Sequence, residues 1–235
     1  MKVFDSNIYV YMIRVFSKKE YRDDFIRGHM YLNESGYFNK LEDSFRGDKY
    51  DSKIVEYNAT IFINGHEFHP DIMTQGFVGD GKVPILCMTI LNEEALVRTH
   101  NNKFKLKQSV VDELSQFGEY GLLFYYGELR ENLEKYAKAH DWFIDQDVVT
   151  YVDAKKNKEY LNLYFHDRFK KYFVKDITYI NQNETRLIFL NKSNPFIPLV
   201  SQENNHIEFD IDPLLSYYEF DIKKNIEMEF KKTTK

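Results

Sequence analysis

Residues 173–189 read FVKDITYINQNETRLIF, and this stretch carries most of the information about the fold and the candidate site. The segment Thr185–Leu190 ends in four apolar residues and predicts a strand inside a sheet. If strand pairing begins a few residues earlier, a period of two places Gln182, Glu184 and Arg186 on one face. Three polar groups then project together, either as a functional cluster or as a solvated face in which Glu184 pairs with Arg186.

The rest of the chain also favours strands. Its 18 tyrosines and 20 phenylalanines, set against 10 glycines and 5 prolines, are typical of sheets with a broad aromatic surface. The other predicted strands are Ile8–Phe16, His29–Asn33, Ile54–Ile63, Val83–Leu91, Tyr120–Tyr126, Val148–Val152 and His206–Ile211, with Lys171–Tyr179 either a further strand or an irregular approach to one.

Two helices are predicted between these strands. The first follows Ser17, which can cap it together with Glu20, and it ends at Gly28 in a left-handed conformation. The second, Glu128–His140, carries apolar residues at helical spacing and predicts an amphipathic helix packed on a sheet. Residues 34–53 are polar and predict a long loop with a turn at residues 46–48.

These elements predict one α+β domain over residues 1–230, followed by a frayed basic tail at residues 231–235. We expect a mixed, mostly antiparallel sheet with a few amphipathic helices. No repeat, low-complexity linker or shift in composition marks a second domain.

Composition excludes several classes of protein. The single cysteine, Cys87, excludes a disulfide scaffold and indicates a reducing cytoplasm. A formal net charge of -5 argues against a general duplex-DNA binder. No apolar run approaches the length of about 18 to 20 residues that a membrane span needs, so no membrane partner is expected. The oligomeric state is not predicted.

Three motifs resemble functional sites, but their surroundings favour ordinary structure. Residues 76–82, GFVGDGK, have the spacing of a phosphate-binding loop, yet Val83 and Pro84 follow where a Ser or Thr and a helix are required. His66 and His69 are too few ligands for zinc, so no metal is predicted. Cys87 lies in the apolar run VPILCMTIL, where a thiol packs as a small apolar group.

Several sequence segments, in the same order along the chain, resemble an uncharacterised protein family from phages, prophages and Firmicute genomes. They are YRDDFIRGHMYLNESGYFN at residues 21–39, LEDSFRGD at 41–48, VPILCMTIL at 83–91 and the stretch 173–189. The resemblance covers most of the chain. In layout this family is similar to ADP-ribosyltransferases, which implies a split β-sandwich as the form of the sheet.

The resemblance also implies roles for individual residues. Gln182-Asn183-Glu184 matches the late strand that carries a Gln-x-Glu pair, and Arg14 matches the first-strand residue that holds the dinucleotide. The Ser-Thr-Ser strand of the arginine-specific class is absent, because Leu86–Ile90 offers only Thr89 at that place. NAD would then be a substrate and not a resident cofactor.

The chemistry that this resemblance implies is coherent. Cleavage of the ribose–nicotinamide bond builds positive charge, which the Glu184 carboxylate would stabilise while Gln182 orients the acceptor. Arg14 would hold phosphate or ribose through charge-assisted hydrogen bonds. The remaining candidate contacts are Arg186 on the same face and four stacking aromatics, Tyr11, Tyr31, Tyr37 and Phe38.

Two other functions remain open at this point. One is a non-catalytic phage or defence-related protein, such as a counter-defence inhibitor, that binds a host protein or a nucleotide signal through the aromatic loop at residues 33–51. The other is a nucleic-acid-processing protein with a groove of lysines and aromatics at residues 103–107 and 170–172.

Overall fold

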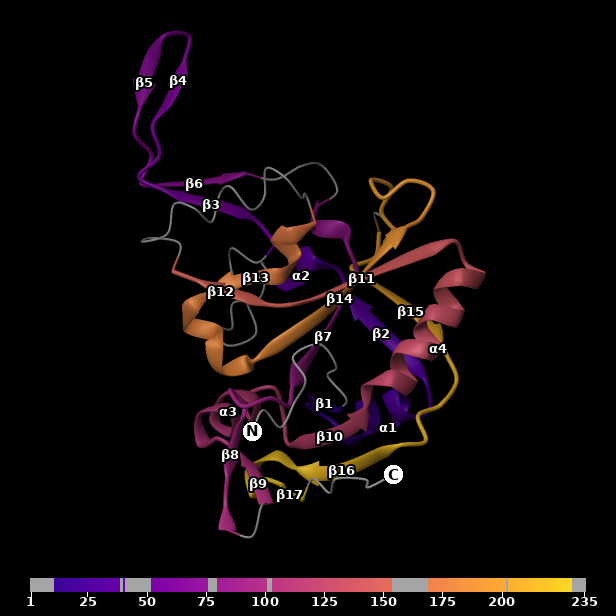
Figure 1. The fold of residues 1–235 in the computed structure, drawn as a ribbon. Coiled ribbons are helices and arrows are strands. Elements are labelled where there is room, and N and C mark those ends of the chain that lie inside the picture. The colour runs from indigo at the N-terminus through magenta and orange to yellow at the C-terminus, as the bar shows by residue number, and fades with distance from the viewer. Residues whose placement is uncertain are drawn as a thin grey trace, which may run out of the picture.

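A six-stranded sheet forms the centre of the protein in the computed structural model, which describes residues 11–38, 40, 52–75, 80–100, 103–153, 169–201 and 203–229 (Figure 1). All neighbouring strands in this sheet run antiparallel. In spatial order they are β11 (Trp142–Val148), β14 (Glu184–Asn191), β7 (Ile85–Ile90), β1 (Tyr11–Phe16), β10 (Tyr120–Tyr125) and β16 (Tyr217–Asp221). The prediction of an α+β fold with mostly antiparallel strands is confirmed.

One face of the sheet is covered by two helices and a two-stranded ladder (Figure 1). They are α1 (Lys19–Ile26), α4 (Tyr126–Ala139) and the antiparallel pair β2 (His29–Asn33) and β15 (His206–Asp210). Leu129 and Leu133 of α4 are fully buried here, which confirms the amphipathic helix predicted from its spacing. Together with Met12, Leu86 and Leu187 from the sheet they form the largest core cluster.

The opposite face is covered by two separate groups of elements. The first comprises α3 (Gln108–Leu114), the turn η5 (Ile222–Lys224) and the ladder of β8 (Leu96–Arg98), β9 (Lys103–Leu106) and β17 (Glu227–Glu229). The second comprises β12 (Thr150–Val152), β13 (Val174–Asp176), η3 (Lys170–Phe173) and η4 (Ile177–Gln182). Each group packs a core cluster of its own against its half of the sheet.

The sheet has a gap between β1 and β7. These strands pair only at Met12 with Ile90 and at Ile13 with Thr89. Beyond that point β1 pairs with β10 alone, while β7 pairs with β14. The two clusters of the second face therefore lie on either side of the gap.

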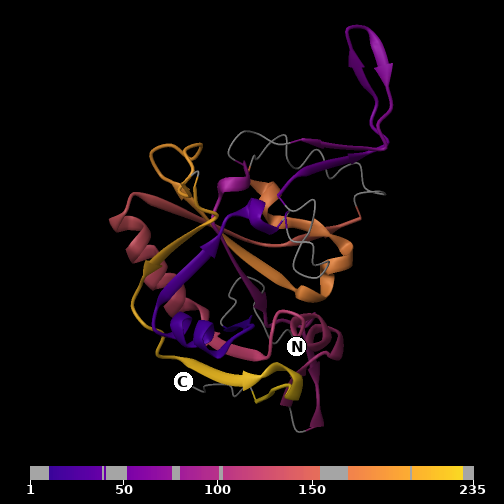
Figure 2. The same ribbon diagram turned by 180° about the vertical axis from the view of Figure 1, so that it is seen from behind.

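A slender arm extends away from the body of the protein (Figures 1 and 2). Its base is β3 (Ile54–Tyr57) paired with β6 (Ile72–Gln75), and its tip is β4 (Ile61–Ile63) paired with β5 (His66–Phe68). The prediction of one strand over residues 54–63 is wrong, because Asn58 has a left-handed backbone with a φ of 52°. Asn64 and Gly65, both with positive φ, make the turn at the tip.

The helix α1 differs from the prediction at its N-terminal end. The N-cap of α1 is Lys18, without a side-chain cap, so the capping role predicted for Ser17 is wrong. Gly28 follows the helix with a φ of 90°, as expected. A Cβ there would lie 2.1 Å from the Ile211 carbonyl oxygen, so only glycine fits.

Several elements of the structure were not predicted from the sequence, and some predicted features fall outside the described residues. The prediction missed α3 and the strands β5, β6, β8, β9, β11, β16 and β17, and the predicted strand at residues 148–152 covers only the end of β11 and β12. The predicted loop at residues 34–53 begins with the short helix α2 (Ser35–Phe38). The turn at residues 46–48, most of the aromatic loop and the tail at 231–235 lie outside the described residues. No described helix is long and apolar enough to cross a membrane.

Candidate functional site

The polar cluster before β14 is shaped by a left-handed residue. The turn η4 ends at Gln182, and Asn183 follows with a φ of 43° before the strand begins at Glu184. The Asn183 side chain donates a 2.7 Å hydrogen bond to the Ile90 carbonyl, and Thr89 Oγ1 donates a 3.0 Å bond to the Gln182 carbonyl. The strand thus begins only at Glu184, and the C-terminal end of the turn is fixed to β7.

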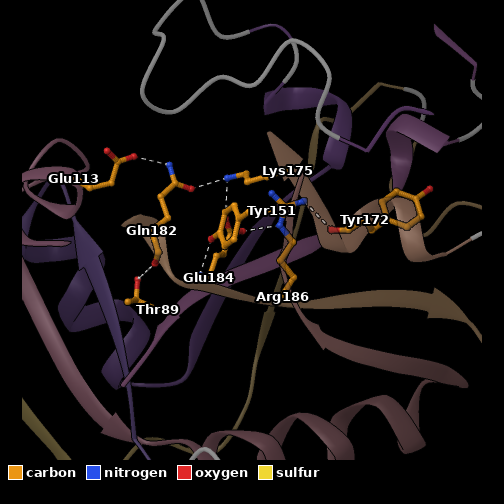
Figure 3. A network of polar contacts seen from close by, with 8 residues as sticks. All are labelled: Thr89, Glu113, Tyr151, Tyr172, Lys175, Gln182, Glu184 and Arg186. Atoms are coloured by element: carbon orange, nitrogen blue, oxygen red, sulfur yellow. Dashed lines mark hydrogen bonds and ion pairs between the residues drawn. The ribbon is translucent and has the colours of Figure 1, made fainter. Parts of the chain in front are cut away.

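A chain of polar contacts runs across this end of the sheet (Figure 3). Gln182 Nε2 donates to Glu113 Oε1 at 2.9 Å, and Gln182 Oε1 accepts from Lys175 Nζ at 2.7 Å. Lys175 Nζ also contacts Glu184 Oε2 at 2.7 Å, and Arg186 Nε contacts Glu184 Oε1 at 2.6 Å. Gln182, Glu184 and Arg186 therefore share one network, as the period of two predicts for the strand residues.

Glu184 is buried and charged at neutral pH. Burial acts to raise the pKa of its carboxyl group, but the charges of Arg186 and Lys175 outweigh this effect and lower the pKa to about 2. The exposed fractions of the Glu184, Lys175 and Arg186 side chains are 6%, 9% and 1%. Arg186 also donates to the Tyr172 carbonyl at 2.7 Å, so its charge is well compensated.

Two further groups lie against the Glu184 end of β14. Tyr151 Oη accepts a 2.9 Å hydrogen bond from the Glu184 backbone amide, and burial together with the carboxylate raises the pKa of this phenol. Burial raises the pKa of the Cys87 thiol, and the negative charge of Glu184 raises it further. A thiol that resists ionisation is a poor nucleophile, so this arrangement does not activate Cys87.

A cavity of about 210 Å³ opens at the gap in the sheet. Its walls combine residues from both faces: Ile13 and Val15 point to one side of β1, whereas Arg14 points to the other. The cavity therefore passes through the gap between β1 and β7. The described residues that line it are Ile13, Arg14, Val15, Tyr31, Asn33, Phe38, Ile85, Cys87, Met88, Thr89, Leu114, Phe117, Lys175, Gln182, Glu184 and Arg186.

Arg14 lines this cavity without a counter-charge from any residue that the structure describes. Its Nη1 atom is buried and has no hydrogen-bond partner, and no ion pair involves its guanidinium within the described part of the chain. The Cζ atom lies 5.3 Å from the centre of the Phe16 ring and 5.0 Å from that of Phe25. Burial lowers the pKa of Arg14 to about 10. A positive charge is thus held beside the cavity, and the described side chains offer it aromatic rings but no carboxylate.

Two of the four predicted aromatic contacts line the cavity. Tyr31 packs flat on His206 at 4.4 Å between ring centres, and Phe38 comes from α2. The structure does not bring Tyr37 there, because neighbouring residues on a helical turn point about 100° apart. Nor does it bring Tyr11, which is half exposed at the far end of β1 and packs edge-on against Tyr125.

The structure also adds residues that sequence reasoning did not single out. Lys175, Asn33 and Tyr151 join the site from β13, β2 and β12. Lys175 lies in the same stretch, residues 173–189, as Gln182 and Glu184. A lysine so close in sequence to two polar residues could have indicated that it belongs to the site. Asn33 and Tyr151 carried no such signal, because only the packing of distant strands brings them in.

The other motifs lie away from this cavity. His66 and His69 belong to the exposed tip of the arm and its approach, and no cluster of metal-ligating side chains occurs in the described ranges. Lys82 is bonded to Glu34, at 2.8 Å, and residues 76–79 lie outside the described part. Lys171 and Tyr172 are buried, so they cannot line a nucleic-acid groove.

No protein-family model matches the chain, and neither a curated protein nor a solved structure is significantly similar to it. The resemblance to phage and prophage proteins and to ADP-ribosyltransferases therefore stays a prediction.

Proposed function

We propose that this protein binds a nucleotide in the cavity between β1 and β7, with NAD as the leading ligand and ADP-ribosyl transfer as the reaction. The observation that carries the proposal is the buried Nη1 atom of Arg14, which has no hydrogen-bond partner among the described residues and belongs to a side chain that lines the cavity. A buried charge of this kind is costly unless it is paired. An anionic group of the ligand supplies the missing partner.

The remaining walls fit the other parts of a nucleotide. Tyr31 and Phe38 offer ring faces for a base, and the polar side chains of Gln182 and Glu184 lie in the same cavity. A volume of about 210 Å³ suits one nucleotide half of a dinucleotide better than the whole molecule. The second half would then extend out of the gap.

In the transfer reaction the C–N bond between ribose and nicotinamide breaks, and its electron pair leaves with nicotinamide. The ribose carbon becomes positively charged and then bonds to the acceptor, which releases a proton. Glu184 stays ionised throughout the neutral range because its pKa is about 2, so its negative charge can stabilise that centre. Gln182, held by Glu113 and Lys175, would orient the acceptor.

One observation favours a second function, the binding of a nucleotide signal without catalysis. Both carboxylate oxygens of Glu184 are already engaged, Oε1 by Arg186 and Oε2 by Lys175. Catalysis requires the contact with Lys175 to be exchanged for one with the ribose hydroxyl. A protein that only binds a nucleotide needs no such exchange.

Titration calorimetry with NAD, ADP-ribose and AMP tests the proposal. We expect binding by the wild type and at least a tenfold loss of affinity in Arg14→Gln, because a charged hydrogen bond is worth about 1.5–3 kcal/mol. Arg130→Gln is the matched control, since that arginine is exposed on α4 and pairs with Glu134. Equal affinities in wild type and Arg14→Gln, or no binding of any of the three, would overturn the proposal.

Release of nicotinamide from NAD separates the two functions. Transfer or hydrolysis predicts release by the wild type and a loss of at least a hundredfold in Glu184→Gln. Thermal denaturation of the variant must show that it folds. Arg14-dependent binding without release identifies the non-catalytic function.

A further inference from the structure

A second polar atom beside the cavity also lacks a partner. Asn33 Oδ1 is buried and accepts no hydrogen bond from any described residue. Asn33 is one of the residues that line the cavity. An unpaired buried acceptor lowers stability because it has lost its hydrogen bonds to water, so such atoms are rare in folded proteins and need an explanation.

The backbone around Asn33 holds this residue in place. Asn33 is the last residue of β2 and pairs with His206 of β15. The next residue, Glu34, donates its amide to the Asn205 carbonyl at 2.8 Å and pairs through its buried carboxylate with Lys82 at 2.8 Å. Ser35 then donates to the Val83 carbonyl at 2.8 Å. These contacts fix the end of β2 against the start of β7, so Asn33 cannot easily turn away.

Asn33 and Tyr31 share one side of β2, since they are two residues apart in a strand. One face of the Tyr31 ring is covered by His206. A flat ring that packs near Tyr31 would therefore bring its polar substituents close to the Asn33 amide. That amide can accept from an N–H group, and its own NH₂ can donate to a carbonyl oxygen.

We infer that Asn33 selects the ligand of this cavity, and that the ligand is a nucleotide whose ring carries a neutral primary amide or amine. This inference rests on the proposed function, because it assumes that Arg14 binds the anionic part of the same ligand. Asn33 satisfies its unpaired oxygen with an N–H of the substituent. A ligand with a carboxylate at that position has no N–H to give and leaves Asn33 Oδ1 unpaired beside a second negative charge.

Calorimetry with two ligand pairs tests the inference. Nicotinamide mononucleotide and nicotinic acid mononucleotide differ only in amide against acid, and AMP and IMP differ in amine against oxo group. For the pair that binds, we expect the wild type to prefer the amide or amine by at least tenfold. Asn33→Ala should lower the affinity for the preferred nucleotide about tenfold and remove the preference. Asn33→Asp, which keeps an acceptor oxygen, should retain the preference. Asn204→Ala, an exposed position outside the cavity lining, is the control.

The outcomes distinguish this inference from the proposed function. Arg14-dependent binding with less than a threefold preference, or with a preference that survives in Asn33→Ala, overturns the role of Asn33 alone. No binding of any of the four nucleotides overturns the role of Asn33, and it overturns the proposed function as well if NAD and ADP-ribose also fail to bind. Thermal denaturation gives an independent readout: Asn33→Ala removes an unpaired acceptor and should not lower the melting temperature of the free protein, whereas a merely structural role predicts a lower one.

Discussion

Arg14 and Arg186 line the same cavity from opposite sides of the gap in the sheet, but their surroundings differ. Arg186 contacts the Glu184 carboxylate at 2.6 Å and donates to the Tyr172 carbonyl at 2.7 Å. The guanidinium of Arg14 lies over the Phe16 and Phe25 rings and makes no ion pair with any described residue. Around β14 the charge of Arg186 is compensated by protein groups. Around β1 the charge of Arg14 has no compensating group among the described residues.

This difference separates stabilisation from function. A paired buried arginine is part of the fold, because removing its partner leaves a charge without compensation. An unpaired one lowers stability and persists where another component compensates for it. Stability measurements on the two halves should therefore give opposite signs.

The largest expected effect is the loss of Glu184. Glu184→Ala removes the buried carboxylate that contacts both Lys175 and Arg186, so we expect the free energy of unfolding to fall by about 3–5 kcal/mol. Urea denaturation measures this change. Glu134→Ala, which removes an exposed partner of Arg130 on α4, should cost less than about 0.5 kcal/mol. A loss below about 1 kcal/mol in Glu184→Ala would show that the network is no more stabilising than a surface pair.

The next effect is a dependence of stability on acid. The pKa of Glu184 is about 2 in the folded protein, below the value of about 4.3 in an unfolded chain. The unfolded chain therefore takes up the proton first, and the stabilisation present at neutral pH is lost as pH falls from about 5 to 2. The full difference corresponds to about 3 kcal/mol.

Denaturation of wild type and Glu184→Gln from pH 7 to pH 2 isolates this contribution, because glutamine has no proton to titrate. The gap between the two proteins should narrow only below about pH 5. A gap that stays constant down to pH 2.5 would mean that the pKa of Glu184 is the same in both states.

The smallest effect, with the opposite sign, concerns Arg14. Arg14→Met keeps much of the side-chain volume and removes the uncompensated charge, so we expect the free protein to gain about 1–2 kcal/mol of stability. Arg186→Met should instead lose stability, because it leaves Lys175 as the one ion-pair partner of Glu184 among the described residues. Urea denaturation of the two variants without ligand gives the comparison directly. A loss of stability in Arg14→Met would place Arg14 with the structural arginines and remove the main support for an anionic ligand.

Local pattern predicted the parts of the site that belong to one strand. Glu184 and Arg186 share a face because side chains alternate along β14, and Arg14 lies on β1, a segment that its β-branched and aromatic residues predicted as a strand. The helix α4 followed from its apolar spacing in the same way. Prediction failed at Asn58, where a left-handed residue ends β3, and it did not foresee the left-handed Asn183 that precedes β14.

The sequence by itself determined the α+β class, the shared face of Glu184 and Arg186 and the exclusion of a disulfide scaffold. These properties follow from the composition or from backbone geometry within a few residues. Only the tertiary structure decided that β1 and β7 part after two pairs of residues, that Lys175 joins Glu184, and that Arg14 and Asn33 meet at one cavity. Those relations depend on how segments far apart in the chain pack against one another, and no local spacing encodes the gap that remains between them.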